Sequence, residues 1–422
     1  MPKASVRECI LSVVLIITSI FSYFNYALLA IIGVEGTFTS LAFKGFSALI
    51  TIWVIYEYMC NRKQFKLKKS LGIVICLIPI AMTLTILKYG FLHDVLRSYF
   101  LGYFVCVIPA VLAGHLFYYK KNELPWQPAI IVCVLLADIA MLRVLCTPGA
   151  APDYYVFGWN YQMLSYIGTL TAILSVFVLS NYKKSLNIAG GSKEKTVKIF
   201  LIVSIFIGIW ATISGQGRGA LILLVLFAVY MITSMSIKYN QNHKNVLNKI
   251  LLVLTFVVVF IIIKTQIADE NLADNVLLSG RMGQFIKGML ENPKEYILYS
   301  ARGKIYVKVL PAIKNSPIWG HGIGSVFYAA DTYSHNIFLD IMCELGIIGI
   351  GIFIALSCRL IKNSQKDLCT YFVWWILLSD FFVLQLSGYY LYHTGIWFSI
   401  GYLLSSTKIN EKIRKSDETD KT

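Results

Sequence analysis

Several cationic side chains and one histidine, all in the second half of the chain, could together bind an anion and move a proton. Arg218 lies between two glycines, Arg302 precedes an apolar periodic stretch, and His335 is followed by Asn336 where a long apolar run begins. A guanidinium group binds phosphate through paired N–H donors. Histidine, with an ordinary pKa of about 6.5, is well suited to accept a proton from a hydroxyl near neutral pH. These residue types indicate proton transfer beside a phosphate.

Each of these residues also has an ordinary structural interpretation. Arg218 could extend its charged head to the membrane surface, and a lone histidine such as His335 at a helix start is more often structural. Arg281 begins another helical stretch and is a third phosphate candidate. Further candidates, each with a structural alternative, are His321, His393, His93, Lys304 and Lys308.

The elements that must hold these residues are helices that cross a membrane. Hydrophobic residues make up 57% of the 422. Apolar runs of about 17–23 residues recur, each long enough to cross a hydrocarbon core of about 30 Å, and they lack the alternation of strands. Twelve such runs lie at about 9–31, 40–60, 71–88, 98–118, 126–146, 161–181, 199–215, 219–237, 250–266, 336–358, 367–386 and 389–406. The sequence therefore predicts an all-α polytopic membrane protein.

The net charge of +16 does not point to nucleic acid, because Lys and Arg gather in alternate connections between the apolar runs. The connections at about 32–39, 147–160 and 387–388 contain none. By the positive-inside rule, both termini are predicted to be cytoplasmic. The one long polar segment, residues 266–334, then faces the periplasm or the cell exterior.

This polar segment carries two apolar stripes at helical spacing. Their members are Met282, Phe285, Ile286, Met289 and Leu290 in the first, and Ile305, Val309, Leu310 and Ile313 in the second. We expect two short amphipathic helices that lie as a cap on the bilayer interface. Asp269 and Glu270 are the nearest approach to a metal site, but their spacing favours a solvated loop face.

The sequence predicts no cofactor and no metal. Nine cysteines without a Cys-x-x-Cys pair lie in or beside apolar runs, which favours small buried side chains over zinc sites or disulfides. The chain has no Walker A loop and no Gly-x-Gly-x-x-Gly that opens a helix. We therefore expect that ATP hydrolysis by this chain does not drive its activity.

Four motifs, in order along the chain, resemble those of one family. His335-Asn336, nine residues, Gly346, two residues and Gly349 is similar to the His-Asn-x9-Gly-x-x-Gly pattern of the O-antigen ligase and polymerase superfamily. The other three are Gly217-Arg218-Gly219-Ala220, the stretch from Arg302 through Ser316-Pro317 to Gly320-His321-Gly322, and Glu344-Leu345-Gly346. Two positions depart from the family pattern: Gly217 replaces a serine, and His321 stands where an aromatic residue is common.

The resemblance implies transfer of an oligosaccharide from undecaprenyl diphosphate to an acceptor hydroxyl on the periplasmic side of a bacterial inner membrane. It implies that His335 takes the acceptor's proton and that Arg218 and Arg302 bind the diphosphate, with inversion and without a metal. Arg281, His321 and Asn336 are the further expected substrate contacts. The expected architecture is similar to that of GT-C glycosyltransferases.

Four regions follow from this interpretation. Residues 1–198 form an N-terminal bundle of six spans, and residues 199–358 form the catalytic region with the loop 266–334. Residues 359–406 add the last two spans, and residues 407–422 form a charged cytoplasmic tail.

The acceptor separates two enzymatic alternatives. A polymerase uses a second lipid-linked repeat unit, and a ligase uses the lipid A core; the residues from His335 to Gly346 favour the polymerase. Expected partners are therefore the lipid-linked donor, one of these acceptor glycans, membrane lipids and a chain-length regulator, with no nucleic acid. The non-enzymatic alternative is a lipid-linked glycan transporter, which would show related halves and charges along a central path.

Four charged residues inside the apolar runs bear on that last alternative. They are Glu57, Asp138, Arg143 and Asp380. We expect them to make paired structural contacts, or to lie closer to the span ends than the hydropathy indicates, and not to line a transport path.

Overall fold

Helices make up almost the whole of the part of the chain that the structure describes. This computed structural model describes residues 5–33, 38–60, 68–90, 94–147, 159–181, 192–215, 217–238, 292, 301–365, 367–385 and 388–406. No strand occurs among these residues, so the predicted all-α class is confirmed for them.

The chain up to Lys238 contributes eleven of the described elements. They are α1 (Val6–Ser19), α2 (Phe21–Ile32), α3 (Phe38–Cys60), α4 (Lys69–Tyr89), α5 (Asp94–Gly102), the π-helix η1 (Tyr103–Val107), α6 (Ile108–Lys120), α7 (Trp126–Leu145), α8 (Tyr161–Ser180), α10 (Ser192–Gly215) and α11 (Arg218–Lys238). The remaining described elements are α15 (Ala301–Asn315), α16 (Ser325–Ala330), α17 (Ile337–Asn363), α18 (Leu368–Leu384), the 3-10 helix η2 (Tyr390–Tyr392) and α19 (Thr394–Ser405).

Six helices in the described residues are long and apolar enough to cross a membrane. They are Lys69–Leu87, Ser98–Lys120, Trp126–Leu145, Gln162–Ser180, Glu194–Gly215 and Ile337–Lys362. The bent pair α1 and α2 makes up to seven. A multi-pass helical membrane protein is thus confirmed, whereas the count of twelve stays a prediction. The apolar run 250–266 lies outside the described residues.

Two predicted spans have a different form in the structure. The run 9–31 is not one helix, because α1 and α2 meet at Ile20 with a bend of 109°. The run 389–406 contains the short 3-10 helix η2 and the 12-residue α19. At about 1.5 Å per residue, α19 reaches only about 18 Å and is too short to span alone. Every residue of α19 is buried, so its apolar character serves packing within the protein.

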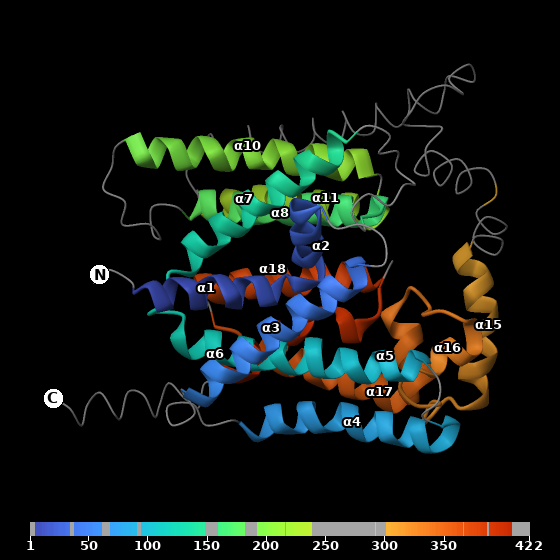
Figure 1. Cartoon of the computed structure of the whole chain (residues 1–422). Coiled ribbons are helices and arrows are strands. Elements are labelled where there is room, and N and C mark those ends of the chain that lie inside the picture. Colours follow the sequence, from blue (N-terminus) through green and yellow to red (C-terminus); the bar gives the residue numbers. More distant parts are fainter. Residues whose placement is uncertain are drawn as a thin grey trace, which may run out of the picture.

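The long helices lie roughly side by side, and α15 stands across one end of them (Figure 1). We call this end the α15 end. It also holds α16 and the start of α17, whereas α6 ends and α4 begins at the opposite end. The second predicted amphipathic helix is thus observed as α15, with Val309 buried and Ile305 and Ile313 partly buried. Leu310 departs from the expected stripe, since it is 52% exposed.

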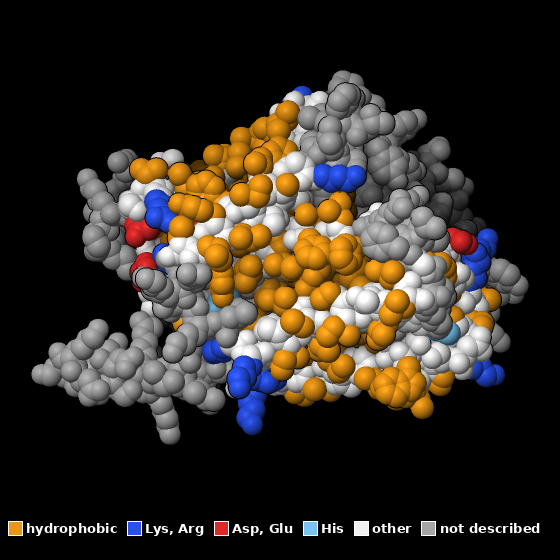
Figure 2. Space-filling view, turned by 60° about the horizontal axis from the view of Figure 1, so that its bottom comes forward, with side chains coloured by type: hydrophobic (Ala, Val, Ile, Leu, Met, Phe, Trp, Pro, Cys, Tyr) orange, Lys and Arg blue, Asp and Glu red, His pale blue; other side chains and the backbone are white. Residues whose placement is uncertain are grey.

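A broad apolar surface separates the two ends of the molecule. Hydrophobic side chains cover the middle of the face in Figure 2, and most charged side chains lie toward its left and right ends. On α4 the exposed apolar residues are Ile73, Leu77, Ile80, Leu84 and Leu87. This distribution is the one expected of a surface in contact with lipid.

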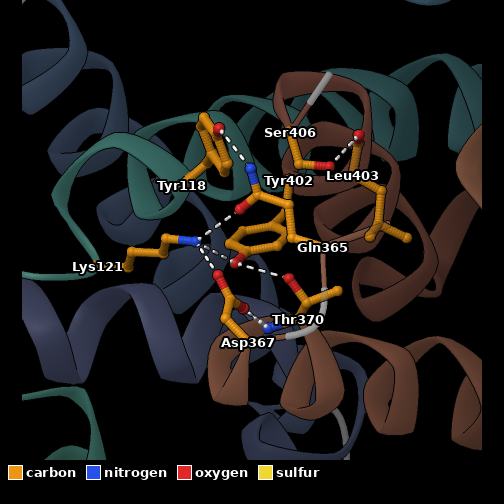
Figure 3. Close-up of polar contacts among 8 residues, drawn as sticks. All are labelled: Tyr118, Lys121, Gln365, Asp367, Thr370, Tyr402, Leu403 and Ser406. Atoms are coloured by element: carbon orange, nitrogen blue, oxygen red, sulfur yellow. Dashed lines mark hydrogen bonds and ion pairs between the residues drawn. The ribbon is translucent and has the colours of Figure 1, made fainter. Parts of the chain in front are cut away.

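The opposite end is held together by a polar network between α6, α18 and α19 (Figure 3). Lys121 forms an ion pair with Asp367 and donates to Gln365 Oε1 at 3.3 Å and to Tyr402 at 3.2 Å. Asp367 in turn caps α18, because its Oδ1 accepts the Thr370 N–H at 2.7 Å. These bonds satisfy polar groups that would otherwise be costly at the end of a membrane bundle.

The four charged residues inside apolar runs make structural contacts, as expected. Glu57 accepts two hydrogen bonds from Arg7, both at 3.1 Å. Asp138 accepts from Ser204 at 2.5 Å, and Arg143 donates to the Ile31 carbonyl at 2.7 Å. The Asp380 carboxyl accepts the Ile396 N–H at 3.1 Å and lies 3.6 Å from His393 Nδ1. Partners therefore explain why these groups lie among apolar side chains.

Candidate active site

Gly346 breaks α17 into two parts at the α15 end. Its φ of 63° and ψ of −159° are not helical, and a positive φ costs glycine little because it has no Cβ. A break of this kind frees N–H and C=O groups that an intact helix would pair, and such groups need partners in the apolar interior of a membrane protein.

Residues 317–322, which we call the clasp, supply these partners. The clasp runs antiparallel to the broken part of α17. Its four bonds are His321 N to Cys343 O at 2.9 Å, Gly322 N to Glu344 O at 2.7 Å, Ile347 N to Pro317 O at 2.9 Å and Ile348 N to Ile318 O at 3.4 Å. The break is therefore a fixed part of the fold.

The clasp and α17 approach so closely that two glycines are required. A Cβ on Gly346 would lie 2.2 Å from the Ile318 carbonyl oxygen, and one on Gly320 would lie 2.4 Å from that of Glu344. Gly320 also has a positive φ, of 66°. The spacing from His335-Asn336 to Gly346 in the sequence motif thus corresponds to the length of helix between the start of α17 and its break.

His335 precedes this helix in a left-handed conformation, with φ of 59°. Asn336 caps the helix, since its Oδ1 accepts from Phe338 N at 3.0 Å and from Leu339 N at 3.3 Å. On the other side, the Ser334 N–H donates to Asp340 at 2.9 Å. Both neighbours of His335 are therefore fixed by bonds to the first turn of α17.

The imidazole of His335 is held in its neutral form. Burial, and then the nearby charge of Arg302, lowers its pKa to about 4. Its ring lies 4.4 Å from that of Tyr333, and its buried Nδ1 has no hydrogen-bond partner among the described residues. A neutral imidazole with an unpartnered ring nitrogen is chemically able to accept a proton.

Arg302 belongs to α15, whereas His335 precedes α17. Arg302 is the second residue of α15 and is partly buried. Its charge is the second cause, after burial, of the lowered pKa of His335. Two of the residues singled out in the sequence are thus coupled electrostatically.

Arg218 begins α11, and the structure describes its backbone only. The residue before it is fixed against α8: the Gly217 N–H donates to Ser165 Oγ at 2.8 Å, and Ser165 donates to the Thr212 carbonyl at 3.1 Å. A Cβ on Gly217 would lie 2.6 Å from that of Ser165. This contact explains why glycine replaces the serine of the family motif.

His321 has a structural bond in the clasp. Its Nε2 lies 2.8 Å from the carbonyl oxygen of Ala312, which accepts the proton, so the ring joins the clasp to α15. The second departure from the family motif is thus accommodated by a hydrogen bond. Whether His321 and Asn336 also contact substrate stays a prediction. Four other sequence candidates, Arg281, His93, Asp269 and Glu270, lie outside the described residues, as does the first predicted amphipathic helix.

A buried carboxyl group and two tyrosines form a part of this region that sequence reasoning did not identify. Glu344 Oε1 accepts from Gly324 N and from Tyr389, and its Oε2 accepts from Tyr390, each at 2.7 Å. Glu344 belonged to a family motif without an assigned role, and nothing in the sequence linked it to the Tyr389-Tyr390 pair at the start of the last apolar run.

A groove of about 500 Å³ lies between α4, α17, α18 and α19. Its wall is almost wholly apolar. At the α15 end it includes Ile337 and Ile341, in the turns that follow His335, and along α17 it continues to Leu360 and Ile361. An apolar groove of this length, with wall residue Ile337 two positions after His335, is suited to a molecule with a long hydrocarbon tail and a polar head.

Comparison with known proteins gives one match. Residues 155–354 match the protein family described as O-antigen ligase. The match covers less than half of the 422 residues, and it includes Arg218, Arg302, the clasp and His335. No curated protein and no solved structure matches the chain. The resemblance drawn from the four sequence motifs is confirmed by this match.

Proposed function

We propose that this chain, a member of the O-antigen ligase and polymerase superfamily, is the polymerase of a surface polysaccharide. Membership makes it a membrane enzyme of glycosyltransferase type that acts on lipid-linked glycans. The finer proposal is that it transfers an oligosaccharide from undecaprenyl diphosphate to a hydroxyl of a second lipid-linked repeat unit. We further propose that the α15 end faces the periplasm and that both termini are cytoplasmic.

The proposed reaction is a single displacement at the anomeric carbon. The acceptor oxygen forms a bond to this carbon as the bond to the diphosphate oxygen breaks, and the configuration inverts. His335 takes the acceptor's proton, and undecaprenyl diphosphate leaves with the bonding electron pair. Arg218 and Arg302 stabilise the negative charge that grows on the leaving phosphate, so no metal is needed. Arg281, His321 and Asn336 are the further proposed substrate contacts.

The observation that carries this proposal is the neutral His335, which is coupled electrostatically to Arg302 and lies two residues before Ile337, in the wall of the apolar groove. The low pKa of about 4 means that the imidazole is unprotonated at neutral pH, as a general base must be before it accepts a proton. The groove supports a polyprenyl tail as its occupant, because its wall is apolar along α17 from Ile337 to Ile361. A tail held there would leave the diphosphate near His335 and Arg302.

The ligase is the second candidate, and the matched family description favours it by name. The polymerase is proposed because the residues from His335 to Gly346 resemble those of O-antigen and capsule polymerases. Both enzymes would use the same donor and the same groups, and they differ in the acceptor. A deletion strain separates them: core capped with one repeat indicates a polymerase, and unsubstituted core with retained lipid-linked polymer indicates a ligase.

The test of transferase activity uses purified protein in lipid nanodiscs with a lipid-linked repeat unit and no energy source. The expected product is a longer lipid-linked glycan, together with undecaprenyl diphosphate. Absence of product from both a repeat-unit acceptor and a lipid A-core acceptor would contradict the proposal. A transporter reconstituted in closed vesicles would move the lipid from one leaflet to the other without making this product.

A further inference from the structure

Glu344 is a fully buried acidic residue at the break in α17, with 0% of its surface exposed. Three neutral donors reach its carboxyl group at 2.7 Å: the Gly324 N–H and the hydroxyls of Tyr389 and Tyr390. Among the described residues, no Lys or Arg forms an ion pair with it. The buried carboxyl group has no water to bond to and depends on these three hydrogen bonds. Loss of any one of them would therefore cost free energy of folding.

The same residue fixes the turn from the clasp into α16 in two ways. Its carbonyl oxygen accepts the Gly322 N–H at 2.7 Å, and its side chain accepts the Gly324 N–H. Gly324 is the residue that begins α16, and no side chain of its own caps that helix. Glu344 therefore takes the place of a helix cap and sets the position from which α16 starts.

Ring contacts connect α16 to His335 through Tyr333. Phe327, within α16, has its ring 6.2 Å from that of Tyr333, and the Tyr333 ring lies 4.4 Å from that of His335. The tyrosines bonded to Glu344 support the same helix from the other side. Tyr389 stacks on Tyr99 at 4.2 Å, and Tyr99 meets Phe327 edge-on at 5.4 Å. Phe327 thus contacts Tyr333, which leads to His335, and Tyr99, which leads to the Glu344 partner Tyr389.

We infer that Glu344 is a positioning residue of the proposed transferase. Its carboxyl group joins the Gly322–Gly324 turn to Tyr389 and Tyr390, and through α16 it holds the Tyr333–His335 segment where the imidazole meets the acceptor. Glu344 touches neither donor nor acceptor in this role. The inference rests on the proposed function, since it needs a reaction for His335 to perform. Displacement of a reacting group by about 1 Å can lower a rate about 100-fold.

Three variants test this role. Glu344→Gln keeps an oxygen for Gly324 and Tyr389, and the Tyr390 hydroxyl can turn round to accept from the new amide. Glu344→Ala removes all three bonds. Glu57→Ala is the matched control, because Glu57 is also a buried glutamate, 1% exposed, whose partner Arg7 belongs to α1. Each variant is purified in nanodiscs, and the turnover of lipid-linked donor is measured per folded molecule over pH 4–8.

For Glu344→Gln we expect kcat within about fivefold of the wild-type value. For Glu344→Ala we expect kcat to fall about 100-fold, with KM for the donor changed less than threefold. The acid limb of kcat/KM should also move to higher pH in Glu344→Ala, because a displaced His335 gains water. Glu57→Ala should lower thermal stability and leave both the turnover and the pH profile unchanged.

Two results would overturn the inference. Glu344→Ala could turn over as fast as Glu57→Ala, with the wild-type pH profile, and Glu344 would then support stability alone. Alternatively, Glu344→Gln could be as inactive as Glu344→Ala, and the group would then act chemically. Failure of the proposed function looks different from both: the wild type would make no product, or His335→Ala would make as much as the wild type.

Discussion

Arg302, in the first turn of α15, lies near enough to His335, at the start of α17, for its charge to help lower the pKa of the imidazole to about 4. The two residues come from separate helices, and the clasp joins those helices through the bond from His321 to Ala312. The electrostatic contact couples the residue proposed to bind phosphate to the residue proposed to take the proton. It also makes the pH dependence of the enzyme a property of both residues.

The acid limb of kcat/KM should therefore lie near pH 4 and not near the ordinary histidine value of about 6.5. Only neutral imidazole accepts a proton, so activity falls as the pH drops through the pKa of His335. Arg302→Gln removes the charge that lowers this pKa, and its acid limb should move upward. Arg302→Lys keeps a charge and should keep the limb low, although it loses the planar paired donors. A limb near 6.5 in the wild type would contradict a buried, neutral base.

His335→Ala should lower transfer by at least about two to three orders of magnitude, while the protein still inserts into the membrane. The control is His115→Gln, which changes a buried histidine bonded to Ser405 at 2.6 Å in the α6–α19 contact. That variant should lose stability and not turnover per folded molecule. Glycan length in a complemented deletion strain and product formed in nanodiscs measure the two effects. Near-normal glycan with His335→Ala would remove the histidine from the mechanism.

Gly346→Ala should open the clasp. The added Cβ would lie 2.2 Å from the Ile318 carbonyl oxygen, and the residue would keep a positive φ. A left-handed conformation costs a non-glycine residue about 1–2 kcal/mol, and overlap in a packed region adds about 1–3 kcal/mol. Gly351→Ala, in the same helix, is the matched control because nothing lies within 4 Å of its added Cβ. The measurement is thermal unfolding of both variants in detergent. Equal stability would mean that the clasp moves to accept the added methyl group at little cost in free energy.

Gly217→Ser, which restores the serine of the family motif, should lower activity. Its Cβ would lie 2.6 Å from the Cβ of Ser165 and displace the start of α11, where Arg218 begins. The second change Ser165→Gly removes the obstruction but also the acceptor of the Gly217 N–H, so the double variant should regain part of the lost turnover. Restoration by this second site is the readout, since unrelated damage to the fold would not be repaired by it. Full activity of Gly217→Ser alone would count against a fixed start of α11.

Lys121→Met should destabilise the protein without changing the reaction. It removes the ion pair with Asp367 and the bonds to Gln365 and Tyr402 at the end of the molecule away from His335 (Figure 3). Asp367 would keep its bond to the Thr370 N–H but lose its cation. Because Asp367 is 37% exposed, the loss should be smaller than the about 3–5 kcal/mol of a fully buried pair. Turnover per folded molecule should equal that of the wild type. A change in turnover would show that the network around Lys121 affects the reaction at the α15 end.

Helix positions followed closely from hydropathy where one long apolar run forms one straight helix. The run 126–146 is the helix Trp126–Leu145, and the run 161–181 is Tyr161–Ser180. The bend at Ile20 could not be predicted, because neither proline nor glycine marks it. At the bend, Gly395 of α19 packs against the Ser19 carbonyl at the end of α1, where a Cβ would lie 2.9 Å away.

In the candidate site, too, some features could be predicted from the sequence and others could not. His335 and Arg302 were identifiable because their chemistry is distinctive and the family motif contains them. The role of Glu344 depends on Tyr389 and Tyr390, which reach it from a distant part of the chain. The role of Ser165 depends on Gly217 of another helix. Such partners become visible only when the helices are assembled, because local spacing carries no signal of them.

The break at Gly346 has a consequence for how the protein is made. The clasp precedes α17 along the chain, so it has left the ribosome before the helix that it holds. A broken α17 without the clasp would expose unpaired N–H and C=O groups to lipid. Because the clasp is synthesised first, the partners of these groups are already present when α17 emerges. The order of the two segments along the chain therefore lets the helix break form without an unpaired intermediate in the bilayer.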